Sequence, residues 1–247
     1  MSDAQFDVEA VFDAADYQYF YSSALRPERT THDVDLVRRL LDLYAGMAVL
    51  DLACGHGRIA NPLAALGCRV VGLDITPAFL DQARQEAVAS GLTVEYVQGD
   101  MRSLPWTERF EGILSLFTAY GYFDDDDNRV VLAQAYHALK PGGKLLIDLN
   151  SRDYILKNYQ HTAVIERDGD YMMDRMRYDV LTDRNHTERI IVRDGQIRRM
   201  RFFVRLFTYP ELATWLRQTG FRHVDGYDQN GQAFTSESRR MVVVAEK

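Results

Sequence analysis

The feature that most constrains the fold is the segment VLDLACGHGR, residues 49–58, in which an apolar run passes directly into a glycine turn. An uninterrupted apolar run is typical of a strand that is buried on both faces, as in a parallel sheet. Gly55 and Gly57, with the spacing Gly55-x-Gly57-x-x-Ala60, permit a tight turn from this strand into a helix. The segment therefore predicts a strand–turn–helix unit whose backbone can approach a nucleotide-like ligand closely.

The pattern around this segment extends the unit to a larger α/β fold. From about residue 31 to residue 150, apolar residues recur alternately at strand and at helix spacing, which is typical of βαβ units around a parallel sheet. A helix is expected from Thr208, which forms a capping box with Glu211, and two closing strands follow it. The expected strands are 47–53, 68–74, 93–100, 110–117, 144–150, 221–228 and 239–247.

The segment 161–207 has a different character from the rest of the chain. Its residues alternate with a period of two, and Asp168-Gly169 and Asp194-Gly195 are strong hairpin-turn signals. This pattern predicts an inserted antiparallel β meander. We therefore expect three parts, which are an N-terminal lid at 1–30, a core at 31–150 and 208–247, and an inserted antiparallel β subdomain at 151–207.

The overall composition excludes several classes of partner. A net charge of −7 argues against a nucleic acid, which normally needs a surface rich in Lys and Arg. No run approaches the roughly 20 apolar residues of a membrane span, and the first residues are acidic, unlike a secretory signal. Cys54 and Cys68 are too few for a disulfide framework or a thiolate-rich zinc site. We expect a cytoplasmic protein that acts on a small molecule.

The acidic run Asp124–Asp127 is the one feature that could suggest a metal site. It stands immediately before an apolar helical pattern, and carboxylates stabilise the positive end of a helix dipole. We therefore interpret the run as a helix start and expect no bound metal.

Two ligands fit the glycine turn, a nicotinamide dinucleotide and S-adenosylmethionine (SAM), and the charges nearby discriminate between them. Asp51 stands just before the turn, where it would repel a pyrophosphate but attract the α-ammonium group of SAM. Asp74 ends the second strand and suits the ribose hydroxyls of either ligand. Asp100 and Met101 end the third strand, where a carboxylate and a backbone amide can bind adenine. Together these acids favour SAM.

The same residues resemble the class I SAM-dependent methyltransferases. The segments VLDLACGHG, VVGLD, QGDM and LKPGGKLLID are similar to successive motifs of that family, and the likeness covers residues 47–150 and the final strand pair. It implies a Rossmann-like fold with a seven-stranded sheet of order 3-2-1-4-5-7-6, in which strand 7 is antiparallel. It further implies SAM as cofactor, S-adenosylhomocysteine (SAH) as product, and cofactor contacts from Ala53, Gly55, Gly57, Ile75 and Leu116.

The candidate acceptor site combines the N-terminal lid with the end of the fourth strand. If the lid is extended, Tyr17, Tyr19 and Tyr21 share one face, whereas a helix would scatter them. We expect Tyr17 and Phe117 to line the site of methyl transfer and Tyr21 to contact the cofactor. An aromatic ring beside a sulfonium is favourable, because its π-face attracts cations. Arg29 is a candidate partner for the cofactor carboxylate.

The lid, Phe117 and the meander together resemble antibiotic-pathway small-molecule N-methyltransferases, and in particular those that act on lincosamides in the celesticetin pathway. This resemblance implies a homo-oligomer and a secondary-amine acceptor, namely the proline-ring nitrogen of an N-demethyl lincosamide. A sugar amine, a glycine-like amine or a hydroxyl acceptor would suit the same residues. Outside this class, a NAD-dependent oxidoreductase and a non-catalytic cofactor-binding module remain as alternatives.

Overall fold

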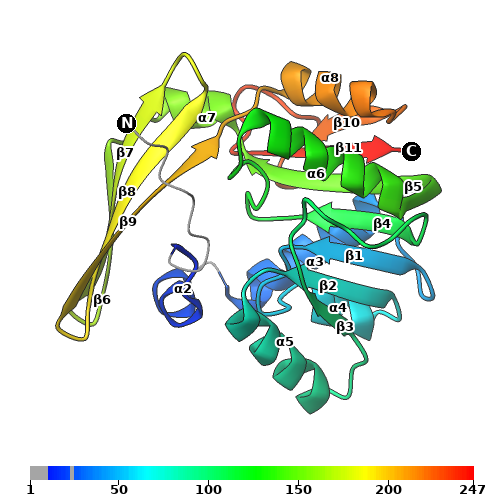
Figure 1. The fold of residues 1–247 in the computed structure, drawn as a ribbon, viewed down its shortest axis with the longest axis horizontal. Helices are drawn as coiled ribbons and strands as arrows, with labels where there is room; N and C mark the ends of the chain where they lie inside the picture. Colours follow the sequence, from blue (N-terminus) through cyan, green and yellow to red (C-terminus); the bar gives the residue numbers. More distant parts are fainter. Residues whose placement is uncertain (1–10, 23–24) are drawn as a thin grey trace.

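The computed structural model describes residues 11–22 and 25–247, and a seven-stranded sheet forms its centre (Figure 1). The parts of the expected N-terminal lid at residues 1–10 and 23–24 lie outside the described residues. The strands of the large sheet are β1 (Ala48–Leu52), β2 (Arg69–Asp74), β3 (Glu95–Gln98), β4 (Phe110–Ser115), β5 (Leu139–Asn150), β10 (Val224–Tyr227) and β11 (Arg240–Glu246).

The strand order confirms the predicted topology. Across the sheet the order is β3-β2-β1-β4-β5-β11-β10, so β10 and β11 are the sixth and seventh strands. Strand β11 runs antiparallel to both of its neighbours, β5 and β10, while the other pairs are parallel. The chain reverses direction across the sheet between β1 and β4, and open α/β sheets bind their ligands at the carboxyl ends of the strands beside such a point.

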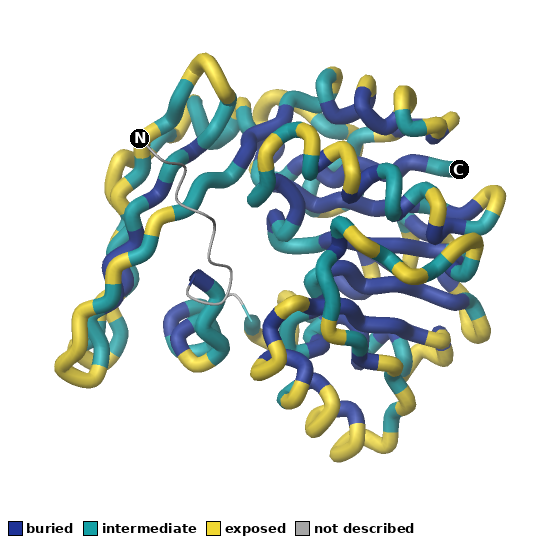
Figure 2. Tube along the Cα trace, viewed as in Figure 1, coloured by how far each residue is buried: buried dark blue, intermediate teal, exposed yellow. Residues whose placement is uncertain are grey.

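Helices cover both faces of this sheet, which explains why its strands are apolar throughout. Successive side chains of β1 point to opposite faces, so Leu50 and Leu52 pack in one cluster and Val49 in another. Figure 2 shows the central strands buried along most of their length. The first cluster includes residues of α6 (Asp125–Ala138) and α8 (Tyr209–Thr219), and the second includes residues of α3 (Pro27–Leu40), α4 (Ala60–Ala65) and α5 (Pro77–Ala89).

A separate antiparallel sheet of order β6-β7-β8-β9 is the expected meander, and α7 (Arg152–Lys157) connects β5 to it. The two predicted turns are present, since Asp168 and Gly169 have φ values of 52° and 86°, and Asp194 and Gly195 of 53° and 71°. Consecutive positive φ values suit tight two-residue hairpins. Its strands are β6 (Thr162–Arg167), β7 (Asp170–Asp179), β8 (Arg184–Arg193) and β9 (Gln196–Arg205).

The helix α2 (Ala14–Tyr21) lies between the two sheets and is held by the meander (Figure 1). Its buried Asp16 accepts a hydrogen bond from Arg193 at 2.9 Å and also pairs with Arg198. The Tyr19 hydroxyl donates to the backbone carbonyl of Arg167 at 2.9 Å. Because these contacts are all with the meander, α2 and the small sheet form one unit beyond the strand ends.

The structure decides between the extended and helical alternatives for the lid, and it corrects one expectation at the end of the meander. The stretch around Tyr17 is helical, not extended, so Tyr17 and Tyr21 share a face at a spacing of four residues while Tyr19 points away from them. At α8, Thr208 does accept from the Glu211 amide at 3.3 Å, but the Glu211 carboxylate pairs with the buried Arg205 instead of completing a capping box. An unpaired buried guanidinium would cost more free energy than an incomplete helix cap, so Glu211 pairs with Arg205.

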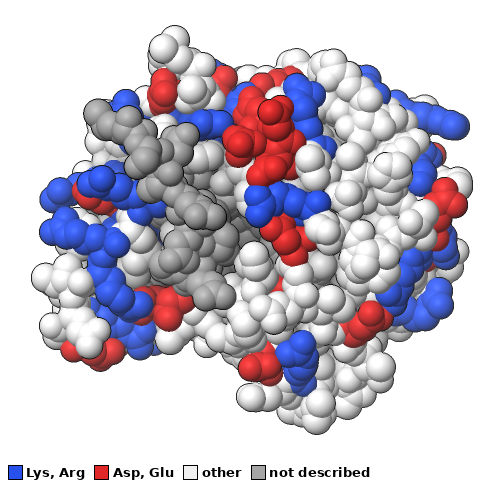
Figure 3. All heavy atoms as spheres, in the orientation of Figure 1, with Lys and Arg blue, Asp and Glu red and all other residues white. Residues whose placement is uncertain are grey.

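Charged side chains gather in two regions on one face of the molecule (Figure 3). On the face in Figure 3, basic side chains gather over the four-stranded sheet, and an acidic patch lies at the start of α6. There Asp124 caps the helix by accepting from the Asp127 amide at 2.9 Å. Within residues 11–22 and 25–247, no group of three or more acidic, His or Cys side chains is arranged to hold a metal ion. None of the helices in those two ranges has the length and apolarity that a membrane span requires.

Candidate functional site

A cavity of about 1100 Å³ opens at the carboxyl ends of β1, β2, β3 and β4. Tyr17 of α2 reaches it from the other side, so the cavity lies between the large sheet and the lid helix. Among the predicted site residues, Tyr21, Arg29 and Gly57 do not line it. The predicted residues that do line it are Tyr17, Asp51, Ala53, Gly55, Asp74, Ile75, Asp100, Met101, Leu116 and Phe117.

The glycine turn after β1 forms the floor of the cavity. Ala53, Gly55 and Gly57 have φ values of 56°, 55° and 80°, a left-handed conformation that glycine adopts without strain. Gly55 lines the cavity, but Gly57 faces the protein interior, where an added Cβ would collide with the hydroxyl of Tyr96. The sequence predicts that Gly57 contacts the cofactor, but the structure places it away from the cavity. The absence of a side chain at this position allows close packing against β3.

Two buried carboxylates stand at the ends of β1 and β2. Asp74 accepts hydrogen bonds from the Gly55 amide at 2.8 Å and from the Thr76 amide at 2.9 Å, so it fixes the glycine turn against β2. Asp51 is only 3% exposed, and burial raises its pKa to about 7, with a further upward contribution from Asp74 and an opposing one from Arg58. A buried acid with such a pKa gains from a cationic ligand, because the cation stabilises the ionised form.

A third carboxylate, Asp100, follows β3 beside the buried Met101. Partial burial acts to raise the Asp100 pKa, but hydrogen bonds from the Arg102 guanidinium and amide outweigh it, so the pKa is lowered. The guanidinium contacts both carboxylate oxygens at 2.6–3.1 Å. Asp100 is therefore ionised at neutral pH and held in place from the side.

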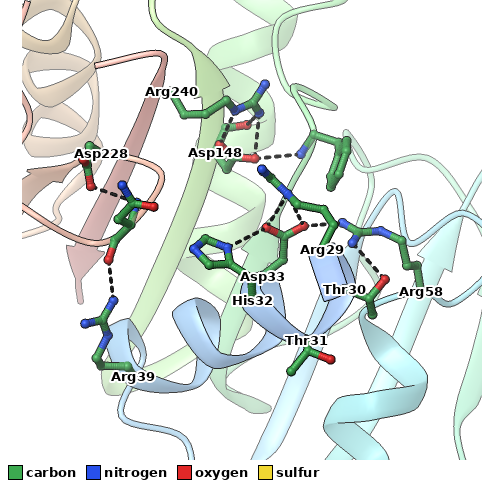
Figure 4. Close-up of polar contacts among 12 residues, drawn as sticks. Arg29, Thr30, Thr31, His32, Asp33, Arg39, Arg58, Asp148, Asp228 and Arg240 are labelled. Atoms are coloured by element: carbon green, nitrogen blue, oxygen red, sulfur yellow. Dashed lines mark hydrogen bonds and ion pairs between the residues drawn. The ribbon is translucent and has the colours of Figure 1, made fainter. Parts of the chain in front are cut away.

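Arg58 is a cavity residue that the sequence analysis missed. It follows the glycine turn, its side chain is 9% exposed, and its guanidinium carbon lies 4.2 Å from the centroid of the Phe117 ring. Arg29 was the expected cation here, but it lies outside the cavity on α3. Figure 4 shows Arg29 and Arg58 both reaching Asp33, each with a contact of 2.9 Å. A basic residue directly after a glycine turn was the available sequence signal.

The backbone is left-handed where the chain leaves β4, since Phe117 and Thr118 have φ values of 58° and 59°. Asp148 of β5 stabilises this turn: its carboxylate accepts from the Phe117 amide at 3.0 Å, and its carbonyl accepts from the Thr118 amide at 3.0 Å. Arg240 of β11 in turn binds the Asp148 carboxylate with contacts of 2.6 and 2.8 Å (Figure 4). Strain of this kind persists only when neighbouring groups enforce it, so the position of the Phe117 ring is specified by three strands.

The tyrosines of α2 divide between the cavity and the meander. Tyr17 lines the cavity, with its ring 5.5 Å from Phe79 and 5.1 Å from Tyr21, and burial raises its pKa. Tyr21 was expected to contact the cofactor, but its hydroxyl accepts a hydrogen bond from Arg189 of the meander at 2.9 Å. The helical spacing explains both placements, because Tyr21 lies one turn further from the cavity.

His56 also lines the cavity, between Tyr17 and Phe79, at ring distances of 6.5 and 6.3 Å. Burial lowers its pKa, with the nearby Arg58 acting in the same direction and Glu86 opposing, so the ring is neutral at pH 7. The geometry therefore supplies a neutral imidazole, to which the sequence analysis assigned no catalytic role.

Comparison with known proteins supports the expected class. Residues 49–143 match the family model of a methyltransferase domain. A demethylmenaquinone methyltransferase of Thermus thermophilus is 36% identical over 115 residues, 44% of this chain and 51% of that protein, so the chain spans about half the length of this relative. A putative methyltransferase of Geobacillus is 27% identical over 94% of this chain and 98% of its own length. The cypemycin N-terminal methyltransferase of a Streptomyces species is 28% identical over 82% of this chain and 84% of its own length.

Solved structures share the fold over nearly the whole chain. A SAM-dependent methyltransferase from Clostridium acetobutylicum has a TM-score of 0.80 at 18% identity, covering 95% of this chain and 97% of its own. The CcbJ methyltransferase from Streptomyces caelestis has a TM-score of 0.75 at 24% identity, covering 89% of this chain and 95% of its own. The sugar N-methyltransferase KedS8 from a Streptoalloteichus species has a TM-score of 0.63 at 19% identity, covering 100% of this chain and 95% of its own.

The cavity and these comparisons agree on the class of protein. Residues 49–143 match a methyltransferase domain. The chain as a whole has a Rossmann-like methyltransferase fold with an added four-stranded sheet. The acidic lining suits a ligand with two positive centres and no phosphate, which SAM is and a dinucleotide is not. The methyltransferase-domain match and the acidic lining therefore support SAM as the cofactor in preference to the dinucleotide of an oxidoreductase.

Proposed function

We propose that the protein methylates a secondary amine of a small molecule, and that the acceptor is the proline-ring nitrogen of an N-demethyl lincosamide. SAM, when bound, supplies the methyl group from its sulfonium centre. The observation that carries the proposal is the set of three carboxylates, Asp51, Asp74 and Asp100, which end successive strands around one cavity. The aromatic groups Tyr17 and Phe117 line the same cavity.

The carboxylates would hold the cofactor by its polar groups. Asp51 is placed for the α-ammonium, because it is buried and its pKa of about 7 lets a cation draw it into the charged form. Asp74 is placed for the ribose, since its position at the end of β2 is the usual one for a ribose-binding acid. Asp100 and the Met101 amide would contact the adenine, with Ala53, Gly55, Ile75 and Leu116 as the cavity wall.

The acceptor-binding residues would act by orientation and exclusion of water. Phe117 is fixed by Asp148, and Tyr17 by its ring contacts with Phe79 and Tyr21, so both aromatic walls are rigid. A neutral amine has its own lone pair and needs no strong base during in-line transfer, so positioning supplies most of the rate. On this account, Tyr17 and Phe117 are the catalytic residues in the sense that they contact the reacting groups.

The names of several similar proteins support an amine acceptor. The comparisons include a cypemycin N-terminal methyltransferase, a sugar N-methyltransferase and a glycopeptide N-methyltransferase. Each name applies to that protein alone, and a sugar amine or a glycine-like amine would fit the same cavity. A hydroxyl acceptor is the other alternative, with the neutral His56 as the only described histidine in the cavity wall that could take its proton. The cytoplasmic location and the homo-oligomeric state remain predictions.

The proposal is tested by incubating the purified protein with SAM and a panel of acceptors, with products detected by mass spectrometry. The panel contains an N-demethyl lincosamide, an aminosugar, glycine and a hydroxyl analogue of each. The expected result is that only the amines gain the mass of one methylene group, and that the lincosamide gives the greatest conversion to product. Methylation of the hydroxyl compounds alone would overturn the amine assignment, and preference for another amine would overturn the lincosamide.

A further inference from the structure

A second, larger pocket lies on the other side of Phe117 from the cofactor cavity. It is an open pocket of about 1450 Å³, part of which is bulk solvent, and it is lined by the start of α3, the end of β5, α7 and the loop that leads into β11. Phe117 is the only residue that lines both pockets within residues 11–22 and 25–247. Because Phe117 stands at the expected site of transfer, a group in this second pocket can belong to the molecule that is methylated.

The lining of the second pocket is strongly basic. It contains four arginines, two on the α3 side and two at the start of β11, against a single acid, Glu28. The chain as a whole carries a net charge of −7, so this concentration of positive charge departs from the average surface. A concave surface of one sign raises the local concentration of ligands of the opposite sign. The four arginines are Arg26, Arg29, Arg239 and Arg240.

The contacts of three of these arginines, Arg29, Arg239 and Arg240, leave positive charge available in the pocket. Arg240 is paired with Asp148 and positions the Phe117 turn. Arg29 shares Asp33 with Arg58, so one carboxylate serves two guanidinium groups. Arg239 is exposed and its side chain forms no ion pair with any residue in the described part of the chain; its guanidinium carbon lies 6.0 Å from the centroid of the Tyr154 ring.

We propose that this arginine-lined pocket binds an anionic group, a carboxylate or a phosphate, of the same acceptor whose amine is methylated. This inference rests on the amine methylation of the proposed function and offers a different acceptor from the lincosamide, whose proline carboxyl is an amide: the acceptor carries an amine and a free acidic group. A guanidinium fork matches the two oxygens of such a group, and Tyr154 and Ile155 supply an apolar wall for the carbon skeleton between them.

The test uses acceptors in matched pairs that differ only in charge. The SAH-loaded protein is titrated by calorimetry with L-proline and L-prolinamide, with glycine and glycinamide, and with an amine phosphate and its parent alcohol. The expected result is that within each pair the anionic member binds about tenfold more tightly or better. The carboxylate and phosphate pairs distinguish the two sources of the anion. Equal or tighter binding of the neutral members, or binding of no anionic member, would overturn the proposal.

The variant Arg239→Gln isolates the contribution of the pocket. It should weaken binding of the anionic acceptors about tenfold and change that of their neutral partners less than twofold. The matched control is Arg222→Gln, an exposed arginine before β10 that lies outside both pockets and should change nothing. The Kd of SAH is measured in both variants. A loss of SAH affinity in Arg239→Gln would assign the pocket to the carboxylate of the cofactor and overturn the proposal.

The outcomes also separate this proposal from the proposed function. If SAH binds and neutral amines are methylated as well as anionic ones, the methyltransferase assignment stands and the anion pocket is wrong. If SAH does not bind, the proposed function itself fails. The first result is read from the acceptor pairs, and the second from the SAH titration alone.

Discussion

The two pockets on either side of Phe117 carry opposite charge. The cofactor cavity has Asp51, Asp74 and Asp100 in its wall, with Arg58 as its one described cation, whereas the second pocket has four arginines and one acid. The acids belong to the ends of β1, β2 and β3, and the arginines belong to α3 and β11, at the other side of the strand-order reversal. The Phe117 turn thus lies between a pocket with an acidic lining and a pocket with a basic lining.

The two pockets also differ in how firmly their charged side chains are held. Asp74 is fixed by two backbone amides and Asp100 by a guanidinium fork, so the acidic site is formed before any ligand binds. In the basic pocket, Arg240 is fixed by Asp148, but Arg239 is exposed. We therefore expect substitutions in the acidic site to affect cofactor binding strongly and those in the basic pocket to alter acceptor preference.

The largest effect is expected for Asp74→Ala. The change leaves the Gly55 and Thr76 amides without their acceptor and removes the proposed ribose contact, so the Kd of SAH should rise about 100-fold by calorimetry. Asp81→Ala, an exposed carboxylate on α5, is the control and should leave the Kd unchanged. A melting curve shows whether each variant is folded. A folded Asp74→Ala protein with native affinity would remove Asp74 from the cofactor site.

The next largest effect is expected for Phe117→Gly. Glycine tolerates the φ of 58° at this position, so the change removes the ring without straining the turn. Steady-state kinetics should show kcat reduced about thirtyfold, because the amine is no longer held in line, while the Kd of SAH stays within twofold of the native value. If cofactor affinity falls as much as turnover does, Phe117 belongs to the cofactor site and does not separate the two pockets.

A smaller effect is expected from pH, through Asp51. Burial raises the pKa of this carboxyl to about 7, and the ionised form binds the α-ammonium of SAH more tightly. Affinity should therefore increase about tenfold from pH 6 to pH 8 as the carboxyl loses its proton. In Asp51→Asn the affinity should be lower and nearly independent of pH over this range. A pH dependence that survives in Asp51→Asn would assign the titration to another group.

The smallest effect is expected from salt. Between 50 and 500 mM NaCl the KM of an anionic acceptor should increase about threefold, because Arg239 is exposed and screened by ions. The Kd of SAH should change less than twofold, since Asp51 and Asp74 are buried. Equal salt dependence of the two constants would mean that the two pockets do not differ in the way that we describe.

The sequence predicted the sheet well because the signals were local and repeated. Each strand had an apolar run, and the first three strands each had an acid at the end, so the strands and the positions of Asp51, Asp74 and Asp100 could be inferred from local signals. The order of the strands came from the resemblance to the methyltransferase family. The hairpins at Asp168-Gly169 and Asp194-Gly195 were predictable for the same reason, since two consecutive positive φ values require such residues.

The lid and the second pocket could not be predicted in the same way. The lid helix has a local cap in Asp13, but Asp16 attaches it to the meander through Arg193 and Arg198, more than 170 residues away, which no local pattern reveals. The sequence predicts Arg29 as the partner of the cofactor carboxylate, whereas Arg58 is the arginine that reaches the cavity. The basic pocket depends on bringing α3 beside β11, a contact that only the folded chain defines.

The central claim is that the acidic cavity binds SAM, and it is tested most directly by calorimetric titration of the purified protein with SAH and then with NADH. The account predicts micromolar binding of SAH and no detectable heat from NADH. Binding of NADH in place of SAH would contradict it, because a pyrophosphate would then be tolerated beside Asp51.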